Sequence, residues 1–355
     1  MKVVINTTHI NLLGGVSNHF KGLKSFWNED IKYNYIGGRF RIPGAVLLPF
    51  DLLKFLFKII FFSPDLVLLN PSLGKRAIQR DAVYLWLAKL FDLPVIVFFH
   101  GWDENVAKEI DEKPELFIKK FKEADALILL ADEFKQKVKR WGYKNSIFLT
   151  TTKVDDKLIS KLKLSKKKYG KNILFLARVE KEKGIFTTLE IFKALQENHP
   201  DIKLTVAGDG SALSTAKAVV KNKNIKNVDF TGFIGGSELI NTFLKSDIYL
   251  FPTQHGEGMP TSVLEGMAFG LVVITRPVGG ITDFFEDGKM GYLIEDISVP
   301  LYVRSIKKLI EEPKRLAEIG KYNHNFAVKH FLASKVAVSL ESIFREIASE
   351  KRKYE

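Results

Sequence analysis

The feature that most constrains this sequence is a regular alternation of short apolar runs with longer segments of mixed polarity. Several runs are apolar almost throughout, which is typical of strands buried on both faces of a parallel sheet. Because a helix-length segment follows each run, the sequence predicts doubly wound α/β architecture. The predicted strands are KVVINTT, KYNYIGG, DLVLLN, VIVFFH, ALILLA and SIFLTT, and then NILFLA, KLTVAG, VDFTG, DIYLFPT, LVVIT and GYLIE.

A lysine-rich segment, residues 153–171, interrupts this alternation. Its sequence KVDDKLISKLKLSKKKYGK lacks a long apolar run, which is typical of a linker. The chain has 355 residues, enough for two domains that each bury a core. We therefore predict one Rossmann-like domain over residues 1–165 and a second over residues 166–332. Two such sheets can face each other across a cleft, with ligands at the carboxyl ends of their strands.

Composition excludes several classes of protein. Hydrophobic residues make up 46% of the chain, so it folds as a globular protein. The absence of cysteine excludes a disulfide scaffold, a thiolate zinc site and a cysteine nucleophile, and it fits a reducing compartment. No signal-peptide pattern precedes the first strand. The formal net charge of +13 suits anionic partners, namely nucleic acid, phosphorylated metabolites or an acidic membrane face, or it serves solubility alone.

Residues 46–62, VLLPFDLLKFLFKIIFF, form the most apolar segment. It is too short and too charged to cross a bilayer. Lys54 and Lys58 lie within it, and Arg39 and Arg41 precede it. One interpretation is an in-plane membrane contact near a lipid-linked acceptor. The other is a buried helix of the first domain. Liposome sedimentation with Phe55→Glu is a test that separates them.

The stretch GEGMPTSVLEGMAFG holds two glutamates in different settings. Glu257 lies in a glycine-rich turn after a strand, and Pro260 suits the first position of the helix that follows. The first free N–H groups of that helix belong to Thr261, Ser262 and Val263. Together with the helix dipole they predict an anion site that a phosphate can fill.

Glu265 lies in the second turn of the same helix, and its side chain leans back toward the N-terminus. A carboxylate beside a bound phosphate needs hydrogen-bond donors, and the paired hydroxyls of a ribose supply them. Glu257 would face a hydroxyl-bearing group beyond the phosphates. This arrangement matches a nucleotide sugar. The alternative is an ordinary helix start with two solvated glutamates.

Cations and glycines follow other predicted strands. Arg178 and Lys183 follow NILFLA and suit a diphosphate, although both could be solvated loop cations. Gly15 follows the first strand, where a glycine lets the backbone approach a ligand closely. His100 ends VIVFFH, and it could bind a sugar hydroxyl or be structural. Neither G-x-G-x-x-G nor the P-loop pattern occurs, so dinucleotide binding has little support.

The order of the segments GGVSNH, FFHGW, LARVEKEKG, AGDG, TGFI and GEGMPTSVLEGMAFGLVVITRPVGG resembles the retaining glycosyltransferases of family four. These enzymes have the GT-B fold, in which two Rossmann-like domains face a central cleft. The resemblance spans nearly the whole chain and is strongest over residues 172–283. One segment departs from the family: TTTKVDDKL stands where an asparagine–glycine–valine–aspartate turn is usual.

The resemblance implies a role for each candidate residue. Arg178 and Lys183 would neutralise the donor diphosphate, Glu257 would hold the transferred sugar, and Glu265 would hold the ribose. The N-terminal domain would bind the acceptor, and the last helix, residues 333–355, would return to that domain. Other implied donor contacts are Gly15 at the phosphate, His100 at the sugar, Phe233 and Ile234 at the base, and Gly258, Met259, Pro260, Thr261, Ser262 and Val263 at sugar and phosphates.

We therefore predict a retaining glycosyltransferase that moves a sugar from a nucleotide-sugar donor, a UDP-sugar rather than a GDP-sugar, to a glycan or polyprenol-linked acceptor. The process would be assembly of cell-surface polysaccharide or lipopolysaccharide. No D-x-D motif occurs, so we expect no metal. We also expect no cofactor and no nucleic-acid partner. The expected location is cytoplasmic, peripheral on the inner face of the plasma membrane. The alternatives are a nucleotide-sugar epimerase of the same fold and a non-catalytic scaffold that binds the nucleotide sugar.

Overall fold

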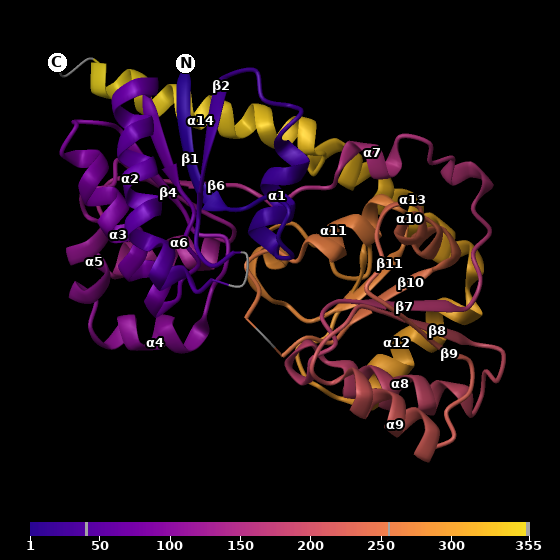
Figure 1. Cartoon of the computed structure of the whole chain (residues 1–355). Helices are drawn as coiled ribbons and strands as arrows, with labels where there is room; N and C mark the ends of the chain where they lie inside the picture. Colours follow the sequence, from indigo (N-terminus) through magenta and orange to yellow (C-terminus); the bar gives the residue numbers. More distant parts are fainter. Residues whose placement is uncertain (40–41, 255, 353–355) are drawn as a thin grey trace.

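The computed structural model describes residues 1–39, 42–254 and 256–352. Two six-stranded parallel sheets form the two halves of the molecule, and helices cover the faces of each (Figure 1). Each of the twelve predicted apolar runs contains a strand. The predicted fold class, two doubly wound α/β domains, is confirmed.

The N-terminal sheet has the strand order β2-β1-β3-β4-β5-β6, with every pair parallel. Its direction of winding reverses between β1 and β3, where ligands bind in open α/β sheets. The central strands are buried along their full length because helices cover both faces. The elements are β1 (Lys2–Thr8), α1 (Gly15–Leu23), β2 (Asp30–Ile36), α2 (Gly44–Phe62), β3 (Leu66–Leu69), α3 (Lys75–Lys89), β4 (Val95–Phe98), α4 (Glu104–Glu112), α5 (Glu115–Phe121), β5 (Ala126–Leu129), α6 (Asp132–Arg140) and β6 (Ser146–Leu149).

The C-terminal sheet has the order β12-β11-β10-β7-β8-β9 and reverses between β7 and β10. Counted from β7, this is the strand order of dinucleotide-binding Rossmann domains. The elements are α7 (Asp156–Ile159), η1 (Leu164–Lys166), β7 (Asn172–Leu176), η2 (Lys181–Lys183), α8 (Ile185–Gln196), β8 (Lys203–Ala207), α9 (Leu213–Asn222), β9 (Val228–Gly232), α10 (Gly236–Lys245), β10 (Ile248–Phe251), α11 (Thr261–Ala268), β11 (Val272–Thr275), η3 (Gly279–Asp283), β12 (Gly291–Leu293), α12 (Val299–Glu311), α13 (Pro313–His330) and α14 (Ala333–Arg352).

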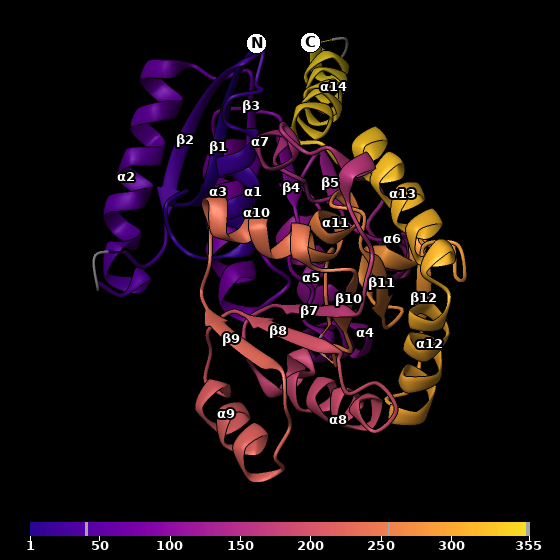
Figure 2. The ribbon, with the colours of Figure 1, turned by 90° about the vertical axis from the view of Figure 1, so that its right-hand side faces the viewer.

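The chain connects the two sheets twice. The segment after β6 pairs with the segment before α14, because the N–H of Val154 donates to Phe331 O at 2.7 Å and the N–H of Ala333 donates to Val154 O at 2.8 Å. Helix α14 then runs along the N-terminal domain (Figures 1 and 2). There the buried Glu341 accepts from the N–H of Asn28 at 2.6 Å. The domain boundaries at residues 165 and 332 stay predictions, and residues 353–355 lie outside the described part.

The carboxyl ends of the two sheets meet at the domain interface. A side chain added at Gly258, after β10, would lie 2.4 Å from His100 O, after β4. The Thr152 hydroxyl, after β6, donates to Met259 O at 3.3 Å. The loops that follow strands of one domain therefore press against those of the other, which places the candidate residues near this interface.

Helix α2 combines features of both interpretations of residues 46–62. One face packs into the core of the first domain, where Phe55 is fully buried. The opposite face is exposed, as shown by Phe57 at 63% and Phe61 at 70% exposure. Phe55→Glu is thus a poor test of surface binding, because it would place a charge in the core. Arg41 lies outside the described residues.

Within the described ranges, no helix combines the length and apolar character needed to cross a bilayer.

Candidate functional site

Glu257 and Lys183 meet at the carboxyl edge of the C-terminal sheet. Lys183 Nζ lies 2.5 Å from Glu257 Oε1, and the Thr253 hydroxyl donates to the same oxygen at 3.3 Å. Lys183 is 8% exposed. It ends η2, and Gly184 follows with φ of 85°, a conformation that favours glycine. The two residues follow β7 and β10, the strands at which the sheet order reverses, so the pair lies where ligands bind in this architecture.

Glu265 is a buried carboxylate on α11. It is 7% exposed, and none of the described residues donates a hydrogen bond to its side chain. Burial raises the pKa of Glu265 to about 7, while the Lys153 ammonium acts to lower this pKa and the Asp155 carboxylate acts to raise it. A desolvated carboxylate without donors is costly, and a ligand that brings hydroxyl donors would offset that cost.

The N-terminus of α11 lies between the two glutamates in sequence. Pro260 is its N-cap residue, one position before the first helical position that the sequence predicted, and no side chain from the described residues caps the helix. The Ser262 hydroxyl is bonded to Tyr249 OH at 2.6 Å instead, and Val263 points into the core. The N–H groups of Thr261 and Ser262 therefore remain available to an anion. The prediction that the N–H of Val263 is also free is wrong, because it donates to Pro260 O at 3.1 Å.

Two glycines allow the loop around Glu257 to adopt its position. A side chain at Gly258 would clash with His100 O, as described above. Gly279, at the start of η3, has φ of 50°, and a Cβ there would lie 2.0 Å from Glu257 O. These approaches hold the loop between η3 and the N-terminal domain, with Met259 buried beside it. They explain why the segment needs glycine at these places.

Three predicted donor contacts are open to solvent, unlike the buried pair. Arg178 is exposed, and its guanidinium donates to Glu180 at 3.1 Å. Phe233, in the loop after β9, is 67% exposed, whereas its neighbour Ile234 is buried. A side chain at Gly15, the first residue of α1, would meet nothing within 4 Å. The structure thus brings Lys183 and Glu257 into direct contact, and it leaves these surfaces open.

His100 is held in one tautomer by Asn70, which follows β3. The Asn70 amide nitrogen donates to Asn6 O at 3.1 Å and to Leu68 O at 3.3 Å. The Asn70 oxygen is therefore the group that faces His100 Nε2 at 3.1 Å, and Nε2 carries the proton. Burial lowers the pKa of His100 to about 3, so the ring is neutral. Its Nδ1 then carries a lone pair, which can accept a hydrogen bond but cannot donate one.

Sequence reasoning missed three buried residues here. Lys153 is 2% exposed, and its ammonium donates to Asn18 of α1 at 3.5 Å. His19 of α1 packs against His100 with ring centroids 4.9 Å apart, and neither ring nitrogen has a partner among the described residues. Asn70 is the third. Each occupies a position in the sequence that could have marked it as a candidate site residue. Lys153 lies in the segment that departs from the family pattern, His19 ends the segment GGVSNH, and Asn70 ends the predicted strand DLVLLN.

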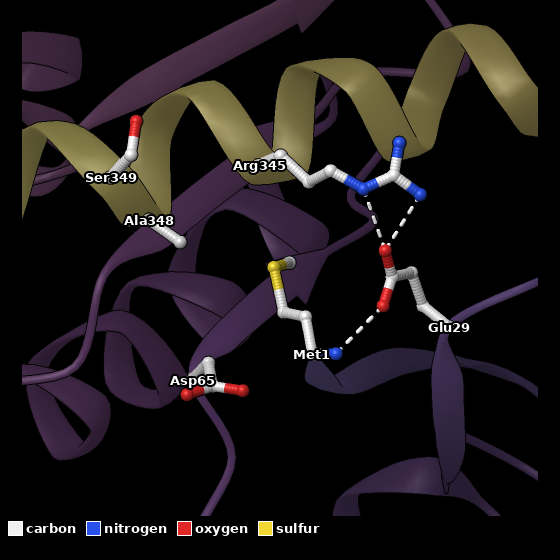
Figure 3. A pocket seen from close by; sticks show the side chains of 6 residues that line it. All are labelled: Met1, Glu29, Asp65, Arg345, Ala348 and Ser349. Atoms are coloured by element: carbon white, nitrogen blue, oxygen red, sulfur yellow. Dashed lines mark hydrogen bonds and ion pairs between the residues drawn. The ribbon is translucent and has the colours of Figure 1, made fainter.

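A pocket of about 450 Å³ lies elsewhere, under α14 (Figure 3). It opens where β1, β2 and β3 begin, at the edge opposite to the carboxyl ends of the sheet. Glu29 bridges the N-terminal amine at 2.7 Å and Arg345 at 2.6 Å across it. These ion pairs join α14 to the sheet, and the pocket is separate from the candidate site. Its lining residues are Met1, Glu29, Asp65, Arg345, Ala348 and Ser349.

Comparison with known proteins finds similar sequences, chiefly for the C-terminal half of the chain. Residues 156–326 match the family described as glycosyl transferases group 1. Spore coat protein SA of Bacillus subtilis is 29% identical over 191 residues, which cover 50% of each chain. The lipopolysaccharide 1,2-N-acetylglucosaminetransferase of Salmonella typhimurium is 28% identical over 160 residues, 42% of each chain. The chain spans about half the length of the curated relatives it matches.

The solved structures extend the likeness to both domains. The crystal structure of HepE from Anabaena in complex with UDP and glucose has a TM-score of 0.75 and covers 98% of this chain and 100% of that one. At 14% identity this likeness shows the fold alone. The protein is thus a two-domain α/β protein of the GT-B type. Over residues 156–326 its C-terminal half is similar to the glycosyl transferases group 1.

Proposed function

We propose that the protein transfers a sugar from a nucleotide-sugar donor, with a UDP-sugar favoured over a GDP-sugar, to a glycan or polyprenol-linked acceptor. The observation that carries this proposal is the arrangement around α11. A buried carboxylate without donors and a buried lysine–glutamate pair flank an uncapped helix N-terminus. The helix N-terminus and Lys183 match a diphosphate, Glu265 matches the ribose hydroxyls, and Glu257 matches the hydroxyls of the sugar. One of the relatives named above is a lipopolysaccharide 1,2-N-acetylglucosaminetransferase, which supports the same substrate class.

The donor diphosphate would bind between the two domains. The Lys183 ammonium has three N–H donors, so its pairing with Glu257 leaves two for phosphate oxygens. The exposed Arg178 could turn from the half-buried Glu180 toward the same phosphates. The N–H groups at Thr261 supply the third source of positive potential. Glu265 would accept from the ribose hydroxyls, and the exposed ring of Phe233 offers a surface on which the base can stack.

Transfer requires the bond between the anomeric carbon and the β-phosphate oxygen to break, with its electron pair leaving on the phosphate. The acceptor oxygen forms its bond to the anomeric carbon on the same face, and its proton passes to the departing phosphate oxygen. Anomeric configuration is then retained. Lys183, Arg178 and the α11 N-terminus stabilise the developing charge by preorganised electrostatics. Metal-independent transfer is part of the proposal, because the sequence lacks the D-x-D motif that holds a divalent metal in many transferases.

Neutral His100 would accept a hydrogen bond from a donor-sugar hydroxyl through Nδ1, as its tautomer requires. The backbone of residues 258–263 would contact sugar and phosphates, and Gly15 would leave room for a phosphate oxygen. The N-terminal domain would hold the acceptor. We place the protein in the cytoplasm, peripheral on the inner face of the plasma membrane, where lipid-linked acceptors are accessible.

Thermal-shift measurements with UDP-, GDP-, ADP- and dTDP-sugars test the donor, because a ligand that binds the folded state raises its melting temperature. We expect the largest shift with a UDP-sugar, and its loss in Glu265→Ala. NMR of the product then reads the anomeric configuration. An inverted product, or a sugar attached covalently to Glu257, would contradict the mechanism. Conversion of the donor without any acceptor would indicate an epimerase, and binding without turnover would indicate a scaffold.

A further inference from the structure

Helix α2 carries two apolar faces, and only one of them is used by the fold. The inner face, with Phe55 and Ile59, packs into the first domain. The outer face repeats large apolar residues at spacings of three and four, which places them in one stripe along the helix. All are more than half exposed: Val46 59%, Phe50 60%, Leu53 64%, Phe57 63%, Ile60 55% and Phe61 70%.

The neighbouring helix α3 adds to this apolar surface. It packs beside α2 against the same core. Trp86 is 60% exposed, and Leu90, directly after the helix, is 59% exposed. Monomeric globular proteins rarely leave so many large apolar side chains together in water, and such patches mark interaction surfaces. Figures 1 and 2 show α2 on the outer side of the N-terminal domain, away from the C-terminal sheet.

The charges on these two helices all have one sign at the surface. Each helix has a single carboxylate, and both are buried against an arginine: Asp51 is 1% exposed and bonded to Arg39 at 2.9 Å, and Asp81 is 0% exposed and bonded to Arg80 at 2.8 Å. Lys54 is exposed within the apolar stripe. Over α2 and α3, both fully described, the surface is therefore apolar and basic without an exposed carboxylate.

We propose that the outer face of α2, extended by α3, docks onto the surface of an anionic lipid bilayer. This inference rests on the proposed function, because docking would hold the N-terminal domain next to a lipid-linked acceptor. An in-plane helix buries its apolar stripe at the boundary of headgroups and acyl chains, while Lys54 reaches the phosphates. Trp86 is of the residue type that prefers this boundary. A second copy of the chain would cover the apolar stripe too, but the uniform basic charge would then repel itself.

Vesicle sedimentation tests the proposal without donor or acceptor, so its outcome is independent of transferase activity. The parent protein is compared on phosphatidylcholine vesicles and on vesicles that also contain phosphatidylglycerol. We expect binding to the anionic vesicles, weakened by salt because exposed charges are screened. Phe57→Glu with Phe61→Glu should lower the binding constant by at least roughly tenfold, since each substitution removes apolar contact and adds a repelled charge.

The matched control is Val338→Glu, which places the same charge at an apolar position that is 54% exposed on α14. The Val338→Glu variant should bind the anionic vesicles as tightly as the parent protein does. Unchanged melting temperature and donor binding of the Phe57/Phe61 variant would show that its fold is intact. Three results overturn the proposal: no sedimentation of the parent with anionic vesicles, equal binding to neutral vesicles, or a dimer that Phe57→Glu dissociates while vesicles remain unbound.

Discussion

Replacing Glu265 with glutamine should stabilise the protein and at the same time abolish donor binding. The carboxyl pKa rises from 4.5 to about 7 on folding because Glu265 is buried without donors. A raised carboxyl pKa means that the folded chain binds more protons than the unfolded chain between these two values. The contribution of Glu265 to stability is therefore most favourable below pH 4.5 and is lost as pH rises through about 7. Above that window the ionised Glu265 destabilises the fold by about 3 kcal/mol.

Glutamine keeps the shape of the side chain and removes the ionisation. In differential scanning fluorimetry near pH 8, Glu265→Gln should melt roughly 5–10 °C above the parent, given the unfolding entropy of a domain of this size. Near about pH 5 the parent is already protonated, so the difference should nearly vanish. Addition of the donor should shift the parent at pH 8 but not the variant, because an amide cannot replace a carboxylate that accepts two hydroxyls.

Glu257→Gln is the control with the opposite expectation. It leaves the buried Lys183 without its partner, which is destabilising at every pH at which the lysine is charged. The reasoning about Glu265 is refuted if Glu265→Gln melts no higher than the parent at pH 8. It is also refuted if the gain is equal at pH 5 and pH 8, because packing rather than ionisation would then explain it.

Three further substitutions test the rest of the site. Lys183→Ala should lower kcat by roughly 10²–10³-fold. The control is Lys181→Ala, which changes an exposed lysine in the same turn and should leave initial rates unchanged. Equal effects of the two substitutions would argue against a role of Lys183 at the diphosphate. Asn70→Asp should favour protonated His100, because a carboxylate would then face Nε2. The pH–rate profile should gain an ionisation that the parent lacks, since the pKa of His100 in the parent is about 3. Identical profiles would contradict the tautomer assignment. Lys153→Met should move the pH dependence of donor affinity upward, because a cation that lowers the Glu265 pKa is lost; an unmoved midpoint would show that the two groups do not interact.

Much of the fold followed from periodicity. Each apolar run that the sequence predicted as a strand contains one. The central strands are the clearest cases, because a strand buried on both faces of a parallel sheet needs apolar residues at successive positions. The placement of Pro260 and the glycines around Glu257 likewise predicted the start of α11, since these residue types restrict the backbone locally. The order of the loops along the chain then placed Lys183 and Glu257 at strand ends.

The two interpretations of residues 46–62 show where periodicity stops being informative. A helix with large apolar residues on nearly all sides is equally consistent with burial in a core and with binding to a membrane. The structure assigns Phe55 to the core and Phe57 to the surface, two positions apart, because a helix turns by about 100° per residue and the domain covers one side only. Arg39, which precedes this segment, is bonded to the buried Asp51.

The sequence by itself determined the elements, their order and the residue types at each strand end, since these depend on local backbone preferences and on hydrophobic pattern. Tertiary structure decided which of those residues meet. Lys183 and Glu257 are 74 positions apart, and only the packing of β7 against β10 brings their charges within 2.5 Å. Burial of Glu265 and the approach of Lys153 to α1 depend on how segments far apart in the sequence pack together. Desolvation and long-range contact have no local signature, because water is excluded by the assembled fold rather than by any one segment.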